Sequence, residues 1–408
     1  MNILLINHYA GSTQMGMEFR PFYFAQEWVK LGHTVTIVAG DYSHLRQNNP
    51  VIEQDFCQSE EAGIRYIWFK TGTYEGNGVK RALTMARFVG KLLLNAGKIS
   101  KLVKPDVVIS SSTYPLDTYA ARAIARKTKA TLIHEVHDMW PASPVELGGM
   151  SRSNPFIVAM QIAENAAYRR SDYVVSLPSL AEDYMKQHGL RDGGFVCIRN
   201  GVVLADWENP LPLPQGHLDA LTELKKDKFI VGYFGGHALS NALDTLLDAA
   251  KLLEGTNIQV VLVGDGVEKK RLQKRAEDEA ISTVTFLPSV PKLAVPSLVS
   301  HFDCSCLTGL SSPLYRFGIC MNKLFDSMMA AKPIICSIDT PDPILTDENC
   351  GVMVKAGDPQ ALCNAICALQ KMPAEELAAM GENGRKAAME KYNYTALAKQ
   401  FAELFQKP

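Results

Sequence analysis

The sequence predicts an α/β protein made of two doubly wound domains with parallel sheets. Residues 2–39 read as a short apolar strand, a loop containing Gly11 and Gly16, a helix over residues 19–31 and a second apolar strand. The same order of strand, glycine turn and helix begins again at Phe229. A chain of 408 residues exceeds one ordinary core and is long enough for two such domains.

Further short apolar runs complete the two predicted sheets. We expect strands at residues 64–69, 106–110, 131–136, 173–177 and 195–198 in the first half, and at 229–234, 258–263, 284–287, 302–307, 333–337 and 351–354 in the second. This spacing predicts a first domain at residues 1–203 and a second at 228–392. Residues 204–227 are rich in proline and charge and are predicted to be a linker. An amphipathic helix at about 393–408 is expected to return to the first domain.

The composition argues against several classes of protein. The 42 basic and 43 acidic residues show no charge signature of nucleic-acid binding. The nine cysteines lack metal-finger spacing and fit free thiols in a reducing cytosol. The N-terminus has no basic stretch of the kind that opens a signal peptide, and no apolar run approaches the length of a membrane span. We therefore expect a cytoplasmic protein.

One segment, residues 79–104, carries seven Lys or Arg residues and no acidic residue, with apolar side chains between them. A basic amphipathic segment of this kind can lie on an anionic membrane surface. It can also be a crossover helix that packs on the sheet and turns its lysines to water. The sequence leaves both interpretations open.

Residues 312–335 read as a polar loop, a helix that opens near Asn322, and a short buried strand that begins at Pro333. Free N–H groups and the dipole at such a helix N-terminus favour phosphate, and Arg316 and Lys323 add positive charge there. Asp326 lies three residues after Lys323 on the same side of the helix, where a carboxylate can hold sugar hydroxyls. The alternative is a surface salt bridge between Lys323 and Asp326.

A second polar motif, HEVHDMWP, follows a predicted strand at residues 134–141. Side chains alternate between the faces of a strand, so His134 and His137 do not converge, and their spacing is not the i, i+4 of a helical metal site. We therefore expect no metal. His137 beside Asp138 is interpreted as a polar contact near a reacting sugar or a proton handler, with a buried core histidine as the alternative.

Five stretches from residue 198 onward stand in a fixed order. They are IRNGV (198–202), GYFGGHALSNALDTLLDAA (232–250), VLVGDGVEK (261–269), FLPSVP (286–291) and NKLFDSMMAAKPII (322–335). Together they resemble the retaining GT-B glycosyltransferases of the family 4 type. HEVHDMWP and the opening HYAGSTQMGMEFR are similar to a bacterial O-antigen and capsule subgroup, typified by L-N-acetylfucosamine transferases. The resemblance implies GT-B architecture: two Rossmann-like domains facing across a cleft, with the acceptor on the N-terminal domain and the nucleotide-sugar on the C-terminal domain.

The resemblance also assigns individual positions. It implies that Gly235, Gly236 and His237 wrap the donor diphosphate, that Asp326 holds the donor ribose, and that His137 contacts the donor sugar. The remaining expected donor contacts are Asn241, Gly264, Asp265, Gly266, Leu287, Pro288, Gly318, Asn322 and Lys323.

This sequence departs from the family pattern at two places. Gly318 stands where the family has the first of two glutamates, and the family's Arg and Lys are missing near His237 and Asn241. Arg316 and Lys323 can substitute for those cations, because stabilisation of a leaving diphosphate depends on where the charge lies.

These inferences predict a retaining, metal-independent glycosyltransferase that uses a UDP-sugar and no other cofactor. The predicted donor is of hexosyl or N-acetylhexosaminyl type, and the predicted acceptor is lipid-linked or a saccharide in bacterial surface polysaccharide synthesis at the inner face of the plasma membrane. The chain contains no Asp-x-Asp sequence, which suits a reaction without metal. The expected catalytic residues are His137, Lys323 and Arg316, and the expected acceptor contacts are Gly11, Gly16, Met17, Glu18, Arg20 and Asp138. A nucleotide-sugar epimerase of the same architecture and a non-catalytic carbohydrate-binding protein remain as alternatives.

Overall fold

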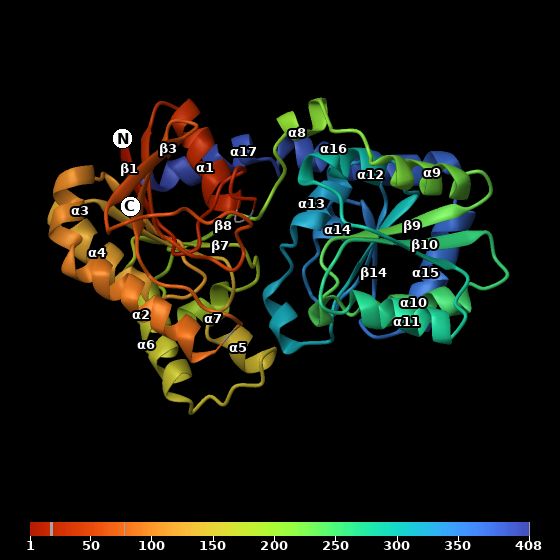
Figure 1. Ribbon diagram of the computed structural model, residues 1–408, viewed down its shortest axis with the longest axis horizontal. Helices are drawn as coiled ribbons and strands as arrows, with labels where there is room; N and C mark the ends of the chain where they lie inside the picture. Colours follow the sequence, from red (N-terminus) through yellow and green to blue (C-terminus); the bar gives the residue numbers. More distant parts are fainter. Residues whose placement is uncertain (17–18, 77, 408) are drawn as a thin grey trace. The chain divides into compact units, whose positions relative to one another are not determined.

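The computed structural model describes residues 1–16, 19–76 and 78–407. The chain divides into two compact units, Met1–Arg199 with Tyr394–Pro408, and Asn200–Asn393 (Figure 1). Each unit has its own parallel sheet and its own buried core, which agrees with the two α/β domains that the sequence predicts.

The first unit is built on an eight-stranded sheet with the order β3-β4-β2-β1-β5-β6-β7-β8. The strands are β1 (Asn2–Ile6), β2 (Thr34–Gly40), β3 (Cys57–Glu61), β4 (Ile64–Phe69), β5 (Val107–Ser110), β6 (Thr131–Val136), β7 (Tyr173–Ser176) and β8 (Phe195–Cys197). Neighbouring strands run parallel except for the β3–β4 hairpin. β3 was not predicted, because this edge strand is polar and mostly exposed and so carries no apolar pattern.

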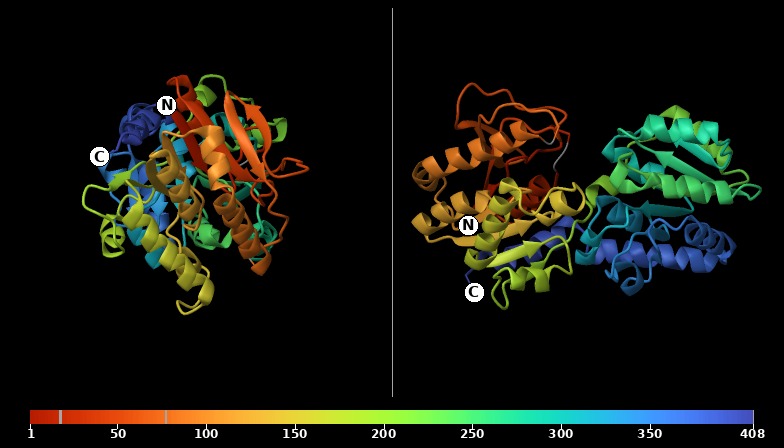
Figure 2. Two further views of the ribbon diagram at one scale, coloured as in Figure 1. Left: turned by 90° about the vertical axis from the view of Figure 1, so that its left-hand side faces the viewer. Right: turned by 90° about the horizontal axis from the view of Figure 1, so that it is seen from below.

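Helices cover both faces of this sheet. They are α1 (Phe19–Lys30), α2 (Val79–Leu94), α3 (Ala96–Val103), α4 (Asp117–Thr128), α5 (Ala142–Glu146), α6 (Pro155–Arg170), α7 (Glu182–Gln187) and α17 (Tyr394–Ala402). Figures 1 and 2 show the blue C-terminal helix among the red-to-yellow elements of this unit. There Trp28 Nε1 donates to the Ala398 carbonyl at 3.2 Å, and the Trp28 and Phe401 rings meet edge to face. The last helix thus belongs to the first unit.

The basic segment at residues 79–104 forms two helices rather than one. The helix breaks at Asn95, whose side chain donates to the Lys91 carbonyl at 2.8 Å. Phe88, Leu92 and Ile99 are buried against the sheet. The crossover-helix interpretation is therefore correct for the inner face of the segment. On the outer face, several of its lysines are exposed.

The second unit has a six-stranded parallel sheet with the order β11-β10-β9-β12-β13-β14. The strands are β9 (Phe229–Phe234), β10 (Ile258–Val263), β11 (Val284–Leu287), β12 (Cys304–Thr308), β13 (Ile334–Ser337) and β14 (Gly351–Val354). The helices are α8 (Ala205–Glu208), α9 (Gln215–Leu224), α10 (Leu243–Leu252), α11 (Lys269–Asp278), α12 (Val295–Ser300), α13 (Asn322–Met329), α14 (Ile344–Asp347), α15 (Pro359–Lys371) and α16 (Ala374–Glu390).

Residues 204–227, predicted to be a linker, form α8 and α9 and belong to the second unit. Leu221 of α9 is fully buried in the core beneath β9, and His217 Nε2 lies 2.9 Å from the Pro288 carbonyl. The three prolines of this stretch all precede α9, with Pro214 at its N-cap, so a proline-rich composition was a poor guide here.

In each unit the first strand lies in the middle of the sheet. β1 lies between β2 and β5, and β9 lies between β10 and β12. The order of the strands therefore reverses at β1 and at β9, and the loops on either side of these strands diverge. The loops at the carboxyl ends of such strand pairs form the crevice in which doubly wound folds bind ligands. These loops are therefore where a functional site is expected.

No helix within the described residues is both long and apolar enough to cross a bilayer.

Candidate functional site

Two glycine loops of the second unit interlock at the carboxyl end of the sheet. Gly235 N donates to the Val263 carbonyl at 2.9 Å, and His237 N donates to the Asp265 carbonyl at 2.7 Å. A Cβ at Gly264 would lie 1.9 Å from the Gly235 oxygen, and one at Gly266 would lie 2.4 Å from the His237 oxygen. Only glycine fits at these two positions, which have φ angles of +156° and +154°. The backbone thus brings together six of the expected donor residues.

Lys323 of α13 reaches this loop from 82 residues away in the chain. Its ammonium donates to Asn241 Oδ1 at 3.0 Å and to the Tyr233 hydroxyl at 2.9 Å, and lies 3.8 Å from the Cβ position of Gly235. Burial lowers the pKa of Lys323 from 10.5 to about 8. No carboxylate in the described part of the chain pairs with it, so the site holds an uncompensated cation.

Asp326 does not pair with Lys323, so the surface salt bridge considered from the sequence is wrong. Both Asp326 carboxylate oxygens accept from Lys292 Nζ at 2.7 Å, and Asp326 is buried. Lys292 follows β11 directly after the Leu287–Pro291 loop, which holds the expected contacts Leu287 and Pro288. Sequence reasoning missed Lys292 because nothing in its local pattern distinguishes it from a surface lysine.

His237 is fully buried, and neither of its ring nitrogens has a hydrogen-bond partner. Burial and the nearby Lys269 lower its pKa to about 4, so the ring is neutral at physiological pH. Lys269 was also missed: its Nζ donates to the carbonyls of Gly264 and Leu287 at 2.7 and 3.2 Å and fixes both loops. A buried imidazole with free nitrogens at a glycine loop is suited to bind a polar ligand.

Arg316 lies on the 3₁₀ turn Pro313–Phe317, ahead of α13, and is exposed. Its Nη1 donates to the Pro313 carbonyl at 2.5 Å, and its guanidinium lies over the Phe317 ring at 4.1 Å. These contacts are local to the turn, whereas Lys323 contacts the glycine loop. Gly318 ends the turn with a φ of +101°, and the exposed Asn322 opens α13, which has no side-chain cap. The first N–H groups of this helix lack an intrahelical acceptor.

In the first unit, His137 follows β6 and is held by its neighbours. Its Nε2 lies 3.1 Å from Glu135 Oε2 and 2.9 Å from Ser111 Oγ, and its side chain is 15% exposed. His134 faces the other side of β6, where Ser110 and Thr118 contact its Nδ1 at 3.0 and 3.1 Å. The strand alternation predicted from the sequence is thus correct. His134 is buried, and burial lowers its pKa to about 4, whereas His137, for which a buried core position was the alternative, remains partly exposed.

The expected acceptor contacts are spread over different environments. Gly11 is buried and its carbonyl accepts from the Tyr66 hydroxyl at 2.9 Å, while Gly16 lies in a turn with a φ of +81°. Asp138 is exposed. Arg20 is buried, and its guanidinium binds Glu135 and two main-chain carbonyls, so it does not point to solvent as an acceptor contact would. Met17 and Glu18 lie outside the described residues.

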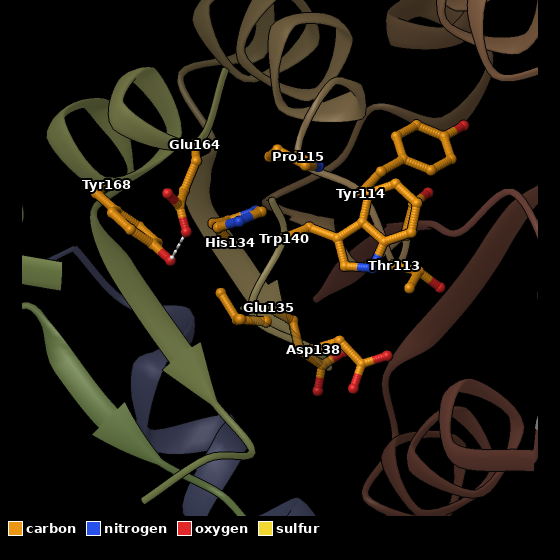
Figure 3. Close-up of a pocket in the computed structure, with 11 residues that line it drawn as sticks. Thr113, Tyr114, Pro115, His134, Glu135, Asp138, Trp140, Glu164 and Tyr168 are labelled. Atoms are coloured by element: carbon orange, nitrogen blue, oxygen red, sulfur yellow. Dashed lines mark hydrogen bonds between the residues drawn. The ribbon is translucent and has the colours of Figure 1, made fainter. Parts of the chain in front are cut away.

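A small hollow, partly open to solvent and with room for about one water molecule, lies at the carboxyl ends of β5 and β6 (Figure 3). Asp138, Trp140 and Glu164 contribute to its wall. Glu164 accepts from the Tyr168 and Tyr184 hydroxyls and from Gln161, and burial raises its pKa to about 7. The wall contains carboxyl and aromatic groups and no lysine or arginine.

Within residues 1–16, 19–76 and 78–407, no three His, Cys, Asp or Glu side chains gather as a metal site would require.

Comparison with known proteins gives matches in both units. Residues 16–201 match the family model "Glycosyl transferase 4-like domain", and residues 218–387 match "Glycosyl transferases group 1". An Escherichia coli (strain K12) protein described as a colanic acid biosynthesis glycosyl transferase, WcaI, is 22% identical over 209 residues. That match covers 50% of this chain and 45% of the relative, so the chain spans less than half of its length.

Solved structures resemble the chain over nearly its full length. Sucrose-phosphate synthase from Thermosynechococcus elongatus has a TM-score of 0.74 at 18% identity and covers 99% of this chain and 98% of its own. Anabaena HepE, solved with UDP and glucose, has a TM-score of 0.66 at 16% identity over 99% and 98% of the two chains. WaaG, a glycosyltransferase involved in lipopolysaccharide biosynthesis, has a TM-score of 0.66 at 13% identity over 100% of both. The two parallel-sheet units have the GT-B fold, and each unit matches a glycosyl transferase family model, which supports a group 1 glycosyltransferase.

Proposed function

We propose that this glycosyltransferase moves a sugar from a UDP-sugar to a lipid-linked or saccharide acceptor, with retention of configuration and without metal. The observation that carries the proposal is the position of Lys323, whose ammonium lies beside the Gly235–His237 loop with no carboxylate partner among the described residues. A diphosphate bound at this loop would compensate the charge. HepE, of the same fold, was solved with UDP and glucose.

Lys323 also accounts for the departure from the family pattern. The resembling family carries a cation in the glycine loop, where this chain has Asn241. Here the Lys323 ammonium is 3.0 Å from Asn241 Oδ1, so a different element supplies the charge at the same place. Preorganised charge at a leaving group is worth roughly 10²–10³ in turnover. Arg316 would have to leave the Pro313 carbonyl to help, so Lys323 carries the larger share in this proposal.

In the proposed reaction, the acceptor hydroxyl attacks the anomeric carbon as the bond to the UDP oxygen breaks. The departing phosphate takes the acceptor proton on the same face of the sugar, which gives retention. Lys323 and the first N–H groups of α13 stabilise the negative charge on the departing UDP. His137 contacts the donor sugar, while Asp326 and His237 bind the ribose and the diphosphate.

We propose that the acceptor binds the first unit near Asp138. Asp138 is exposed at the wall of the hollow shown in Figure 3. Gly11 and Gly16 lie in the loop after β1, where β1 neighbours β5 and the crevice of a doubly wound fold is expected. The WcaI and WaaG names support bacterial surface polysaccharide synthesis as the setting. An N-acetylated amino sugar is the donor that we would test first.

We further propose that α2 and α3 contact the inner face of the plasma membrane. Val79, Leu83, Leu93 and Leu94 are exposed on these helices. The exposed cations Lys80, Lys98, Lys101 and Lys104 lie among them. Apolar side chains interleaved with lysines favour an anionic bilayer surface.

Calorimetric titration with UDP, ADP and GDP, followed by assay of the matching sugar nucleotides, tests the function. UDP should bind, and at 100 times its Kd it should stabilise the protein by about 2.7 kcal/mol. Release of UDP should require an acceptor and should match the amount of glycosylated product. UDP-sugar isomerisation without acceptor would identify an epimerase instead, and sugar binding without UDP release would identify a binding protein.

A further inference from the structure

Arg20 lies at the centre of a buried group of polar side chains, which we call the Arg20 hub: Arg20, Glu135, Ser111 and His137. Arg20 Nε and Nη2 donate to Glu135 Oε1 at 3.1 and 2.9 Å. Glu135 Oε2 accepts from Ser111 Oγ at 2.6 Å and faces His137 Nε2 at 3.1 Å. Glu135 therefore joins the guanidinium to the imidazole, one on each carboxylate oxygen.

The same guanidinium holds the main chain where it leaves the first unit. Nη2 donates to the Ile198 carbonyl and Nη1 to the Arg199 carbonyl, both at 2.8 Å. Residue 200 is the first of the second unit. There Asn200 N lies 3.0 Å from Cys320 Sγ, and Asn200 Nδ2 donates to the Cys320 carbonyl at 2.8 Å. Residues 198–200 are thus bonded on one side to the hub and on the other to the loop that precedes α13.

The charges in the hub fix its geometry. Glu135 is 2% exposed, and burial alone would raise its pKa, but Arg20 and His137 hold it below the usual value. An ionised carboxylate only accepts hydrogen bonds, so His137 Nε2 must carry a proton to bond with it. The Nδ1 face of the ring remains for a ligand. The orientation and tautomer of His137 therefore depend on Glu135, which in turn depends on Arg20.

We propose that Arg20 is a positioning residue that sets His137 through Glu135 and links this setting to the chain crossing at residues 198–200. This inference rests on the proposed function, since it takes His137 as a contact of the reacting sugar.

Four variants test the role: Arg20→Lys, Arg20→Met, Glu135→Gln and the Arg20→Met/Glu135→Gln double variant. We expect Arg20→Met to lower kcat about 100-fold, the cost of misplacing a reacting group by about 1 Å, with the Kd for UDP unchanged. Arg20→Lys should lose nearly as much, because an ammonium cannot bond the carboxylate and both carbonyls in a planar fork. Arg46→Met is the matched control. Arg46 is similarly buried, and its guanidinium donates to the carbonyls of Ala10 and Gly40 and to Asn49 Oδ1.

The pH–rate profile separates positioning from simple loosening of the fold. Removing the guanidinium leaves a bare carboxylate beside His137, so Arg20→Met should move the profile to higher pH. Glu135→Gln leaves the cation alone and should move it to lower pH, each by about one pH unit or more. The double variant restores charge balance and should recover melting temperature but not kcat.

Profiles that move in the same direction, a double variant with wild-type kcat, or an equal loss of kcat in Arg46→Met would overturn the inference. The proposed function fails separately, through a wild-type protein that does not bind UDP. If Arg20→Met proves too unstable to purify, the Glu135→Gln profile and the histidine ¹⁵N NMR spectrum decide. Loss of the Nε2-protonated form of His137 in Glu135→Gln supports the hub, and an unchanged tautomer contradicts it.

Discussion

Replacing Lys323 with methionine should make the ligand-free protein more stable and nearly inactive. Burial lowers the pKa of this lysine from 10.5 to about 8, which corresponds to a cost of about 3 kcal/mol for keeping it charged at neutral pH. Methionine removes that cost but loses the hydrogen bonds to Tyr233 and Asn241, worth about 1 kcal/mol each. The net gain is about 1 kcal/mol, or roughly 2–4 °C in the Tm of a unit of this size.

The gain should depend on pH in a defined direction. Between pH 8 and 10.5 the unfolded chain binds more protons at this position than the folded one, so wild-type stability rises across that window. The Lys323→Met variant lacks this rise, so its advantage of about 1 kcal/mol should disappear near pH 9 and become a deficit of about 2 kcal/mol by pH 10.5. Chemical denaturation of both proteins at several pH values measures the difference.

The same substitution should lower kcat by roughly 10²–10³, because the leaving diphosphate loses its stabilising charge. UDP should raise the pKa of Lys323, so wild-type binding at pH 8 takes up about half a proton. Calorimetry in two buffers of different ionisation enthalpy detects this uptake, which the variant should lack. A variant that is destabilised by more than about 2 kcal/mol and turns over within tenfold of wild type would refute the reasoning.

Three further predictions address other parts of the molecule. Gly264→Ala should abolish UDP binding, because its Cβ would meet the Gly235 oxygen at 1.9 Å, whereas Gly216→Ala, with nothing within 4 Å, should bind UDP normally; titration calorimetry compares them. Glu164→Gln should flatten the pH dependence of the free energy of unfolding. Burial raises the pKa of Glu164 from 4.5 to about 7. About 3 kcal/mol of wild-type stability that is present at low pH is therefore lost as the pH rises through 7. A wild-type urea midpoint that stays constant from pH 4 to 8 would contradict this. Lys80→Glu combined with Lys101→Glu should weaken co-sedimentation with phosphatidylglycerol-containing vesicles about tenfold or more, while Lys274→Glu on α11 should not; equal losses in both would argue against the α2–α3 face.

The parallel strands and their order along the chain could be predicted because buried strands of this type are continuous apolar runs. β4, β6 and β9 coincide with their expected limits. The failures have physical causes. β3 is an exposed polar edge strand, and α9 keeps its proline at the N-terminal end, where composition resembles a linker. Neither feature is visible without knowing what the segment packs against.

The site could be predicted where the backbone itself is the signal, as in the two interlocking glycine loops. Side-chain partners were harder to foresee. The spacing of Lys323 and Asp326 suggested a pair, but Lys292 takes the carboxylate and leaves Lys323 unpaired by any described acid. Arg20 was expected to contact the acceptor, but its guanidinium is buried on Glu135, 115 residues away. The partner of a buried charged side chain depends on long-range packing, which a local sequence pattern does not contain.

Charge balance distinguishes the two units and indicates what each can bind. In the first unit, the buried carboxylate of Glu135 already has Arg20 and His137 beside it, so the hub requires no ionic ligand. In the second unit, the Lys323 ammonium has only neutral hydrogen-bond partners and a depressed pKa. A bound anion stabilises the Lys323 ammonium of the second unit. The same anion would gain little from the first unit, where the buried charges already balance. If the diphosphate bound to the first unit instead, Lys323→Met would leave UDP affinity unchanged, and the assignment of donor and acceptor to the two units would have to be reversed.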